Sequence, residues 1–285
     1  LGASVAGTSP LKWNALLNLV SDAASPEIQR RLIAAMRAAE AAGALVMNGA
    51  SAHAASAGKV AQHALLNLAG LRAPATIAVS EAPAADLLRA ATAAGLRYPL
   101  LLKPNAGGFG NGIASFASEA ELRSASAERL RGAFGIDGLA LLQEQVAPDS
   151  GLVGRIWLLG GEVLCAVRAP AMEIGSDGAS TPSGCMANLK TAVAAVAWDP
   201  PPCVKKEVRR IAELAGASWG SVELLWPQGA DQEQRLYFDL NLSCISTMPD
   251  TLVVSDSNKI WEEDFDPYTA LARFVICKVV EKSSA

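Results

Sequence analysis

Helical and strand-like patterns alternate along the chain up to Gly95. Apolar positions at helical spacing follow a capping residue or proline and stop at a glycine, and short apolar runs lie between these stretches. This alternation is typical of an α/β layer. The expected helices run from Ser25-Pro26 to Gly43, from about Ala57 to Ala69 and from Pro83 to Gly95, with the strands "ALVMN" and "PATIAV" between them.

The pattern changes after Gly95 to strands with fewer helices. The expected strands are "YPLLLK", "IASFAS", "LALLQEQV", "GLVGRIWLLG", "EVLCAVRA", "GSVELLWP" and "RLYFDLNLS". Ser118 and Glu121 form a capping box for a helix through about Arg131, and Gly160-Gly161 predicts a hairpin turn. Two more helices are expected in "PPCVKKEVRRIAELAG" and "DPYTALARFVICKVVEK", and residues 170–200 are expected to form a long mobile loop. We therefore predict an α/β segment followed by an antiparallel α+β segment, with a nucleotide site in the cleft between two lobes.

The composition is that of a globular protein. The chain has 285 residues, of which 51% are hydrophobic and 18% charged. The net charge of −4, with no basic run longer than a pair such as Lys205-Lys206, argues against nucleic-acid binding. No apolar run approaches the roughly 18 residues that a membrane span needs.

Five scattered cysteines without C-x-x-C spacing argue against a disulfide framework and against a zinc site. The two histidines, His53 and His63, are expected on the surface or on helices, so imidazole ligation of a metal is not expected. A reducing, cytoplasmic compartment fits this cysteine usage. The start "LGASVAG" has no Met and no charged segment typical of a secretion signal, and we expect a fragment of a longer chain.

A glycine-rich loop, "KPNAGGFGNG", separates two of the expected strands. A P-loop carries its lysine after the glycines and opens a helix, a dinucleotide fingerprint also opens a helix, and a kinase loop has its lysine on the next strand. Here Lys103 precedes the glycines, and strands flank the loop. Glycines let backbone amides approach phosphate oxygens, and a lysine adds charge. From this segment alone, a phosphate-binding flap and a plain glycine hairpin with a surface lysine both remain open.

Acidic and amide side chains on two later strands point to a metal. In "YFDLNLS", Asp239 and Asn241 are two residues apart and project from one face of a strand. Glu223 stands between Val222 and Leu224 on the preceding strand. If the two strands pair antiparallel, the three side chains converge into an all-oxygen set that suits Mg²⁺ on nucleotide phosphates. A solvated sheet face is the alternative.

The order of these segments resembles the ATP-grasp superfamily from Ala44 onward. The matching stretches are "GKVAQHALLNLAGLRAPATIAVS", "YPLLLKPNAGGFGNGI", "LLQEQVAPDSGLVGRIWLLGGEVLCAVRA", "GSVELLW" and "YFDLNLS", and they are most similar to the ribosomal-protein-modifying (RimK-type) ligases. The resemblance implies an ATP-grasp fold of mixed α/β and α+β class. Its domains would be a truncated α/β lobe over 1–80, a small subdomain with the flap over 81–147, and a large subdomain with the Mg²⁺ site over 148–285.

The resemblance also implies a role for each site residue. ATP would be held by Lys59, Lys103, Gly107, Gly108, Gly110, Gly112, Glu144, Val146, Ala147 and Asp149, and Mg²⁺ by Glu223, Asp239 and Asn241. The two lysines and the glycines would contact phosphates, Glu144 and the backbone of Val146 and Ala147 the adenine, and Asp149 the ribose. Arg155, Arg168 and Lys190 would face the γ-phosphate or an acyl phosphate. The implied activity is an ADP-forming ligation of a small-molecule or peptide carboxylate to an amine.

Three departures from the family pattern keep other functions open. Asp239 replaces the usual Glu of E-x-N, "LSCIST" replaces the usual Pro-Gly after the asparagine, and the first lobe is short. "LLNLVSDA" and the D-x-N are also similar to the inositol polyphosphate kinases. A small-molecule kinase and a non-catalytic ATP-binding module are therefore the alternatives. The sequence leaves open the acid, the amine and a homo-oligomer, and we expect residues 170–190 and the first lobe to select the substrate.

Overall fold

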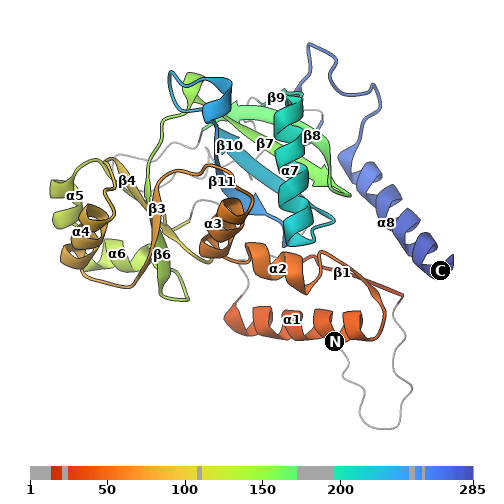
Figure 1. Cartoon of the computed structure of the whole chain (residues 1–285), viewed down its shortest axis with the longest axis horizontal. Coiled ribbons are helices and arrows are strands. Elements are labelled where there is room, and N and C mark those ends of the chain that lie inside the picture. The colour runs from red at the N-terminus through yellow and green to blue at the C-terminus, as the bar shows by residue number, and fades with distance from the viewer. Residues whose placement is uncertain are drawn as a thin grey trace, which may run out of the picture.

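The strands of the chain form three sheets. A computed structural model describes residues 14–20, 25–107, 111–171, 195–243, 248–251 and 254–284. Within these ranges, a four-stranded sheet has the order β3-β6-β4-β5, a six-stranded sheet has the order β11-β10-β7-β8-β9-β12, and β1 pairs with β2. We call the first two the small sheet and the large sheet. Helix α3 lies between them (Figure 1).

The N-terminal region is a small parallel α/β unit. Its elements are β1 (Ala15–Leu17), α1 (Pro26–Ala41), β2 (Leu45–Met47), α2 (Ala50–Ser56) and α3 (Lys59–Leu68). The Ser25 hydroxyl accepts a hydrogen bond from the Ile28 N–H, which confirms the predicted cap of α1. The helix predicted from about Ala57 to Ala69 is confirmed as α3, whereas α2, which ends at Ser56 before the extended Gly58, was not predicted.

His53 lies on α2, which agrees with the expected surface or helical position, and it is fully buried. Its Nδ1 lies 3.2 Å from Asn18 Nδ2, and its Nε2 contacts the Gln29 side chain. Burial lowers the pKa of this imidazole. A neutral, hydrogen-bonded histidine therefore helps to close the N-terminal unit.

The small sheet is antiparallel throughout. Its elements are β3 (Thr76–Ser80), α4 (Ala84–Ala93), β4 (Leu100–Pro104), β5 (Ala114–Phe116), α5 (Glu119–Arg123), α6 (Ala127–Gly132) and β6 (Leu139–Glu144). The helix predicted from Ser118 to Arg131 is two helices, since the Ser126 hydroxyl caps α6 by accepting from the Arg129 N–H. Strand β3, which we expected in the first lobe, pairs with β6 of this sheet. The division into domains remains a prediction.

The large sheet is covered on both faces. Its elements are β7 (Leu152–Leu159), β8 (Glu162–Pro170), β9 (Ala195–Ala197), α7 (Pro202–Ala215), β10 (Trp219–Leu225), β11 (Leu236–Asn241), β12 (Val254–Ser255) and α8 (Pro267–Ser284), with short 3₁₀ turns at Asp149–Gly151 and Gln232–Gln234. Helix α7 packs on the face of Ile156 and Leu224, the α7 face. Helix α8 packs on the face of Trp157 and Leu225, the α8 face.

Two sequence predictions concern the ends of these strands. Gly160 and Gly161 have φ of 63° and 85°, which confirms a tight hairpin that needs the left-handed conformation. Strand β9 lies inside the segment predicted as a loop, so that prediction is wrong for 195–197, and 172–194 lie outside the described residues.

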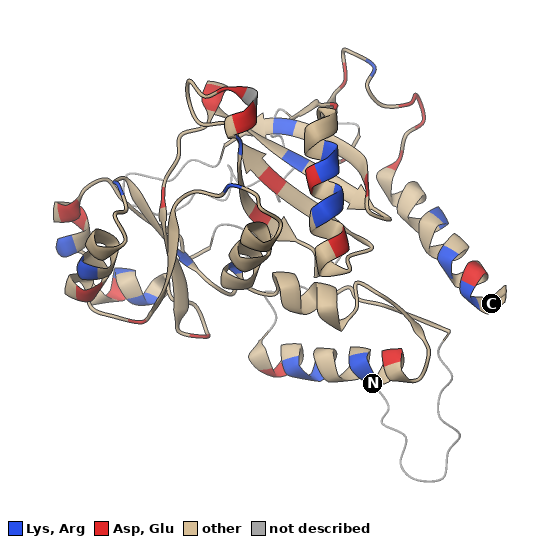
Figure 2. Cartoon of the chain, viewed as in Figure 1, with Lys and Arg blue, Asp and Glu red and all other residues tan. Residues whose placement is uncertain are grey.

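Acidic and basic residues intermix along α1, α7 and α8, as expected for solvated helix faces (Figure 2). In the described ranges we find no helix with the length and apolar character that crossing a membrane requires.

Asn48 joins the N-terminal unit to the large sheet. It is fully buried, with φ of 50°. Its Nδ2 donates to the carbonyls of Trp219 at 2.8 Å and Leu242 at 2.9 Å, and its Oδ1 accepts from the N–H groups of Ser218 at 2.8 Å and Trp219 at 3.1 Å. One carboxamide thus holds the start of β10 against the end of β11.

Replacing Asn48 with alanine should destabilise the protein by about 3–5 kcal/mol, because buried backbone groups lose their partners and alanine disfavours positive φ. Urea unfolding measures the change. The control is Asn67→Ala on the exposed side of α3, which should change the free energy of unfolding by less than about 0.5 kcal/mol. A loss below about 1 kcal/mol for Asn48→Ala would contradict the joining role.

Candidate functional site

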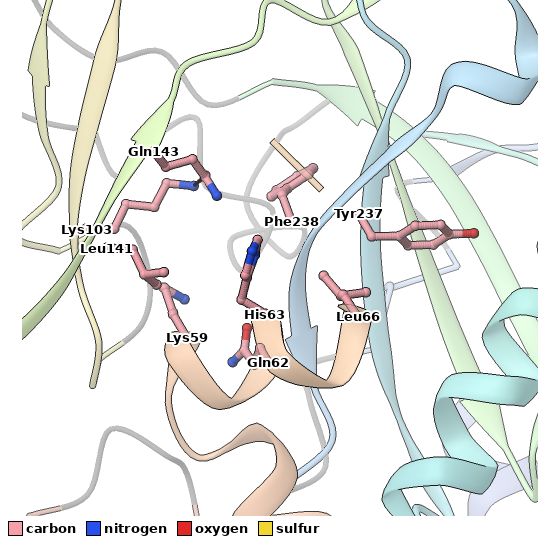
Figure 3. Close-up of a pocket in the computed structure, with 9 residues that line it drawn as sticks. All are labelled: Lys59, Gln62, His63, Leu66, Lys103, Leu141, Gln143, Tyr237 and Phe238. Atoms are coloured by element: carbon pink, nitrogen blue, oxygen red, sulfur yellow. Dashed lines mark hydrogen bonds between the residues drawn. The ribbon is translucent and has the colours of Figure 1, made fainter. Parts of the chain in front are cut away.

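A pocket lies where α3, the small sheet and β11 meet (Figure 3). Its lining combines two lysines, an amide pair and a histidine with apolar and aromatic side chains. The lining residues are Lys59, Gln62, His63, Leu66, Lys103, Leu141, Gln143, Tyr237 and Phe238. Four segments far apart in the sequence, α3, β4, β6 and β11, therefore contribute to one cavity.

Lys103 enters this pocket because of its place on β4. Leu100 and Leu102 pack against α4, α5 and α6, so Lys103 points to the other face of the small sheet. Its Nζ donates to Gln143 Oε1 at 2.6 Å and lies 5.8 Å from the centre of the Phe238 ring. Burial, and then the charge of Lys59, lower the pKa of Lys103 to about 8, although Asp239 and Glu223 partly oppose this. Lys103 is thus a partly buried cation held by a neutral amide.

Lys59, the first residue of α3, reaches β11 of the large sheet. Its Nζ donates to Asp239 Oδ1 at 2.9 Å, and Asp239 Oδ2 accepts from Asn241 Nδ2 at 3.1 Å. Burial alone would raise the pKa of Asp239, but the charge and hydrogen bond of Lys59, and the charge of Lys103, hold it below its usual value. Asp239 is therefore a carboxylate at neutral pH.

Glu223 lies beside Asp239 in the large sheet. The two residues are directly opposite each other on β10 and β11, so the antiparallel pairing on which their convergence depends is present. Arg155, opposite Glu223 on β7, places Nη1 at 3.3 Å from Glu223 Oε1 and donates through Nη2 to the Ser221 hydroxyl at 3.1 Å. Burial raises the pKa of Glu223 to about 6; Arg155 opposes that rise and Asp239 adds to it.

The donor set on these strands fits a hard divalent cation. Glu223, Asp239 and Asn241 supply only oxygen ligands, and their strands bring them to one face. The described ranges contain no cluster of three or more His, Cys, Asp or Glu side chains that could bind a metal by themselves. The two carboxylates are already paired with Lys59 and Arg155. The charges of these carboxylates are therefore already balanced by Lys59 and Arg155. A metal cation bound here would suit an anionic ligand that supplies further negative charge.

Arg168 does not join this cluster, contrary to the prediction. A β-bulge between Trp157 and Leu158 places Arg168 opposite Gly154, on the α7 face, whereas Arg155 and Glu223 lie on the α8 face. The register set at the hairpin by Leu159 and Glu162 would otherwise put Arg168 opposite Val153, on the face of Arg155.

The Arg168 guanidinium instead packs against two indole rings. It lies 4.9 Å from the ring of Trp198 and 4.6 Å from that of Trp226. Burial lowers its pKa, and the charge of Asp149 partly offsets this. Arg168 therefore belongs to the packing beneath α7.

Glu144 also lies outside the pocket. It shares the face of Leu142, which packs under α4, α5 and α6, and its carboxylate accepts from the backbone N–H and the guanidinium of Arg97 at 2.8 to 3.2 Å. The side chain that faces the pocket is its neighbour Gln143, which sequence reasoning missed. The alternation of "LALLQE" could have found it, since Leu142 and Glu144 share one face.

The segment after β6 crosses from the small sheet to the large one. Val146 packs against the core of the α8 face. The Ala147 carbonyl accepts from the Gln228 N–H at 3.2 Å, and the Asp149 N–H donates to the Trp226 carbonyl at 2.7 Å. The backbone of this crossing, which we predicted to hold a base, is thus anchored to the end of β10.

The ends of the glycine loop need glycine. Gly107 and Gly112 have φ of 137° and 76°, and a Cβ on Gly112 would lie 2.7 Å from the Gly132 carbonyl oxygen. Gly108 and Gly110, like Lys190, lie outside the described residues.

Several solved structures share the arrangement of this chain. No protein-family model and no curated sequence matches it. The ATP-grasp ligase PsnB, complexed with a minimal precursor, superposes with a TM-score of 0.53 at 23% identity over 77% of this chain and 62% of its own. The D-alanine–D-alanine ligase of Bacillus anthracis gives a TM-score of 0.57 at 14% identity over 87% and 76% of the two chains. The D-cycloserine synthetase DcsG gives 0.62 at 16% identity over 97% and 86%. The chain therefore has the ATP-grasp fold, as the order of its sequence segments predicted.

Proposed function

We propose that the chain is an ATP- and Mg²⁺-dependent ligase that joins a carboxylate to an amine and releases ADP. One observation carries the proposal: Lys59 and Lys103 converge on one pocket beside the paired carboxylates Glu223 and Asp239. Two partly buried cations next to two carboxylates suit a polyphosphate that brings its own metal ion.

The roles follow from the contacts. Lys103 and Lys59 bind phosphate oxygens, and Glu223, Asp239 and Asn241 hold Mg²⁺, which neutralises phosphate charge when bound. Arg155 acts through Glu223, because its guanidinium already contacts Glu223 and Ser221. Gln143, in place of Glu144, is the polar side chain that faces the base, and we assign no catalytic role to Arg168.

In the reaction, a carboxylate oxygen of the acid attacks the γ-phosphorus and the bond to ADP breaks. The amine nitrogen then attacks the acyl carbon of the resulting acyl phosphate, the C–O bond to phosphate breaks, and the nitrogen loses a proton. Both steps depend on positioning and charge neutralisation, which the lysines provide. No protein nucleophile is required.

The substrates are a small-molecule or peptide acid and an amine. PsnB was solved with a precursor peptide, which supports a peptide as one candidate. The chain covers 62% of the length of the PsnB chain. Lys190, Asp149 at the ribose, the cytoplasmic compartment and a homo-oligomer all stay predictions.

The test is ADP release in the presence of panels of acids and amines, with the product identified by mass. A ligase requires one acid and one amine together, and its product mass equals their sum less one water. ADP release with a polyol phosphate alone would instead indicate a kinase. Nucleotide binding without turnover on any acceptor would indicate a non-catalytic module.

A further inference from the structure

Asn105, two residues after Lys103, connects the start of the glycine loop to the start of α3 and to the segment 137–139. Its carbonyl accepts from the Lys59 N–H at 3.0 Å, and its Oδ1 accepts from the Val60 N–H at 2.9 Å. Its Nδ2 donates to Asp137 Oδ2 at 2.6 Å, and its N–H donates to the Leu139 carbonyl at 3.0 Å. All four polar groups of this residue are therefore engaged.

Helix α3 depends on Asn105 for its cap. The residue before the helix, Gly58, has no side chain to accept from the first N–H groups, which otherwise lack partners at a helix start. Asn105 supplies two acceptors from 45 residues away. A Cβ on Gly58 would lie 2.8 Å from the Asn105 amide atoms, so the close approach requires glycine. The cap of α3 is thus a tertiary contact.

The contacts determine the orientation of the Asn105 amide. Its oxygen faces the N–H of Val60 and its NH₂ faces the carboxylate of Asp137, so a flipped amide would oppose donor to donor and acceptor to acceptor. Asp137 is itself held through Oδ1, which accepts from the Leu139 N–H at 3.2 Å. We call this set of Asn105 hydrogen bonds, which connects the start of α3 to the end of β4, the joint. Its partners accept only one orientation of the Asn105 amide.

The joint lies between two like charges. Lys59 begins α3 and Lys103 is the penultimate residue of β4, and each is within two residues of a hydrogen bond made by Asn105. The charge of Lys59 contributes to the lowered pKa of Lys103, so the two ammonium groups repel each other. Asp239 and Glu223 partly offset this repulsion, and the hydrogen bonds of Asn105 hold together the backbone segments that carry the two lysines.

We propose that Asn105 is a positioning residue that keeps Lys59 and Lys103 at the spacing required to bind one polyphosphate. The inference rests on the proposed function, since that function places both lysines on the phosphates. Asn105 itself acts through the start of α3 and the end of β4.

The test uses a donor–acceptor swap. Asn105→Asp keeps an acceptor for Val60 but brings two carboxylates into contact, so the affinity for AMPPNP measured by calorimetry should fall about tenfold. Adding Asp137→Asn restores one carboxylate and one amide with the net charge of the wild type. The double variant should recover the affinity to within about twofold.

Amide hydrogen exchange without nucleotide gives an independent measurement. The Val60 amide should exchange faster in Asn105→Ala, which removes its acceptor, and in Asn105→Asp, where repulsion from Asp137 displaces that acceptor. In the swap it should exchange at the wild-type rate. The control, Ser126→Ala, removes the cap of α6 outside the pocket and should leave AMPPNP affinity unchanged.

Unchanged affinity in both Asn105 variants, or no recovery in the swap, would overturn the proposal. If the wild-type chain binds no AMPPNP, the proposed function fails. The exchange rates then still decide whether Asn105 joins α3 to β4: faster exchange that the swap reverses supports the joint, and unchanged exchange overturns it.

Discussion

Replacing Lys103 with alanine should lower turnover by about 10²–10³-fold, because one preorganised charge on the phosphates is lost. Lys103 is the cation whose nearest partner, Gln143, is neutral, so its full charge is available to a ligand. Nucleotide affinity should fall with turnover, since the same contact is present before the reaction. Calorimetry with AMPPNP and a coupled ADP assay measure the two effects.

The pH dependence of binding gives a sharper check on Lys103. Its lowered pKa of about 8 means that the charged form predominates below that pH and is lost as the pH rises through it. AMPPNP affinity should therefore decline between about pH 8 and pH 9.5, whereas ordinary lysines stay charged there. Lys103→Arg, which keeps its charge, should remove this decline while retaining binding.

The control for Lys103 is Lys278→Ala on α8. Lys278 also lies 5.8 Å from an aromatic ring, that of Phe274, and pairs with Glu281. Its replacement should leave AMPPNP affinity unchanged. Wild-type activity in Lys103→Ala, with the fold intact by circular dichroism, would refute the site assignment.

Asp239→Asn should lower turnover by at least about a thousandfold, because an isosteric amide removes charge from the metal-binding set and several kcal/mol of charge neutralisation with it. Asp239 also anchors Lys59 and receives the Asn241 amide, so the change alters both sides of the phosphate site. The Mg²⁺ concentration needed for half-maximal activity should rise. An ADP assay at increasing Mg²⁺ separates this effect from a loss of folded protein.

Asp231→Asn provides the matched control for this change. Asp231 caps the turn at Gln232–Gln234 by accepting from Glu233 and Gln234, and asparagine caps as well as aspartate. Its activity and Mg²⁺ dependence should equal those of the wild type. An unchanged Mg²⁺ requirement in Asp239→Asn would place the metal elsewhere.

Most of the elements were predictable because their signals are local. Caps and glycine stops located α1, α4 and α7, and the alternation around Asp239 predicted the face that it shares with Asn241. The helix predictions were less accurate where the capping group comes from a distant part of the chain. Helix α2 was not predicted, and the sequence does not show that Asn105 caps α3, which begins two residues after the predicted start.

The site was predictable where alternation along a single strand shows which side chains share a face. Lys59, Lys103, Glu223, Asp239 and Asn241 were identified from the sequence and its resemblance, and the fold brings them to one region. Whether they bind ATP and Mg²⁺ is still a prediction. Gln143 was missed because we assigned the base contact to the neighbouring carboxylate, Glu144. Glu144 is paired with Arg97 on the opposite face of the strand.

The sequence by itself determined the fold and the residue types of the pocket, because helix caps, strand alternation and glycine conformations act over a few neighbouring residues. The tertiary structure alone decided which of those residues meet. A one-residue bulge in the β7–β8 pair moves Arg168 to the opposite face from Arg155, since side chains alternate with a period of two. Whether a hairpin contains a β-bulge depends on how the folded sheet packs, and no local sequence pattern indicates it.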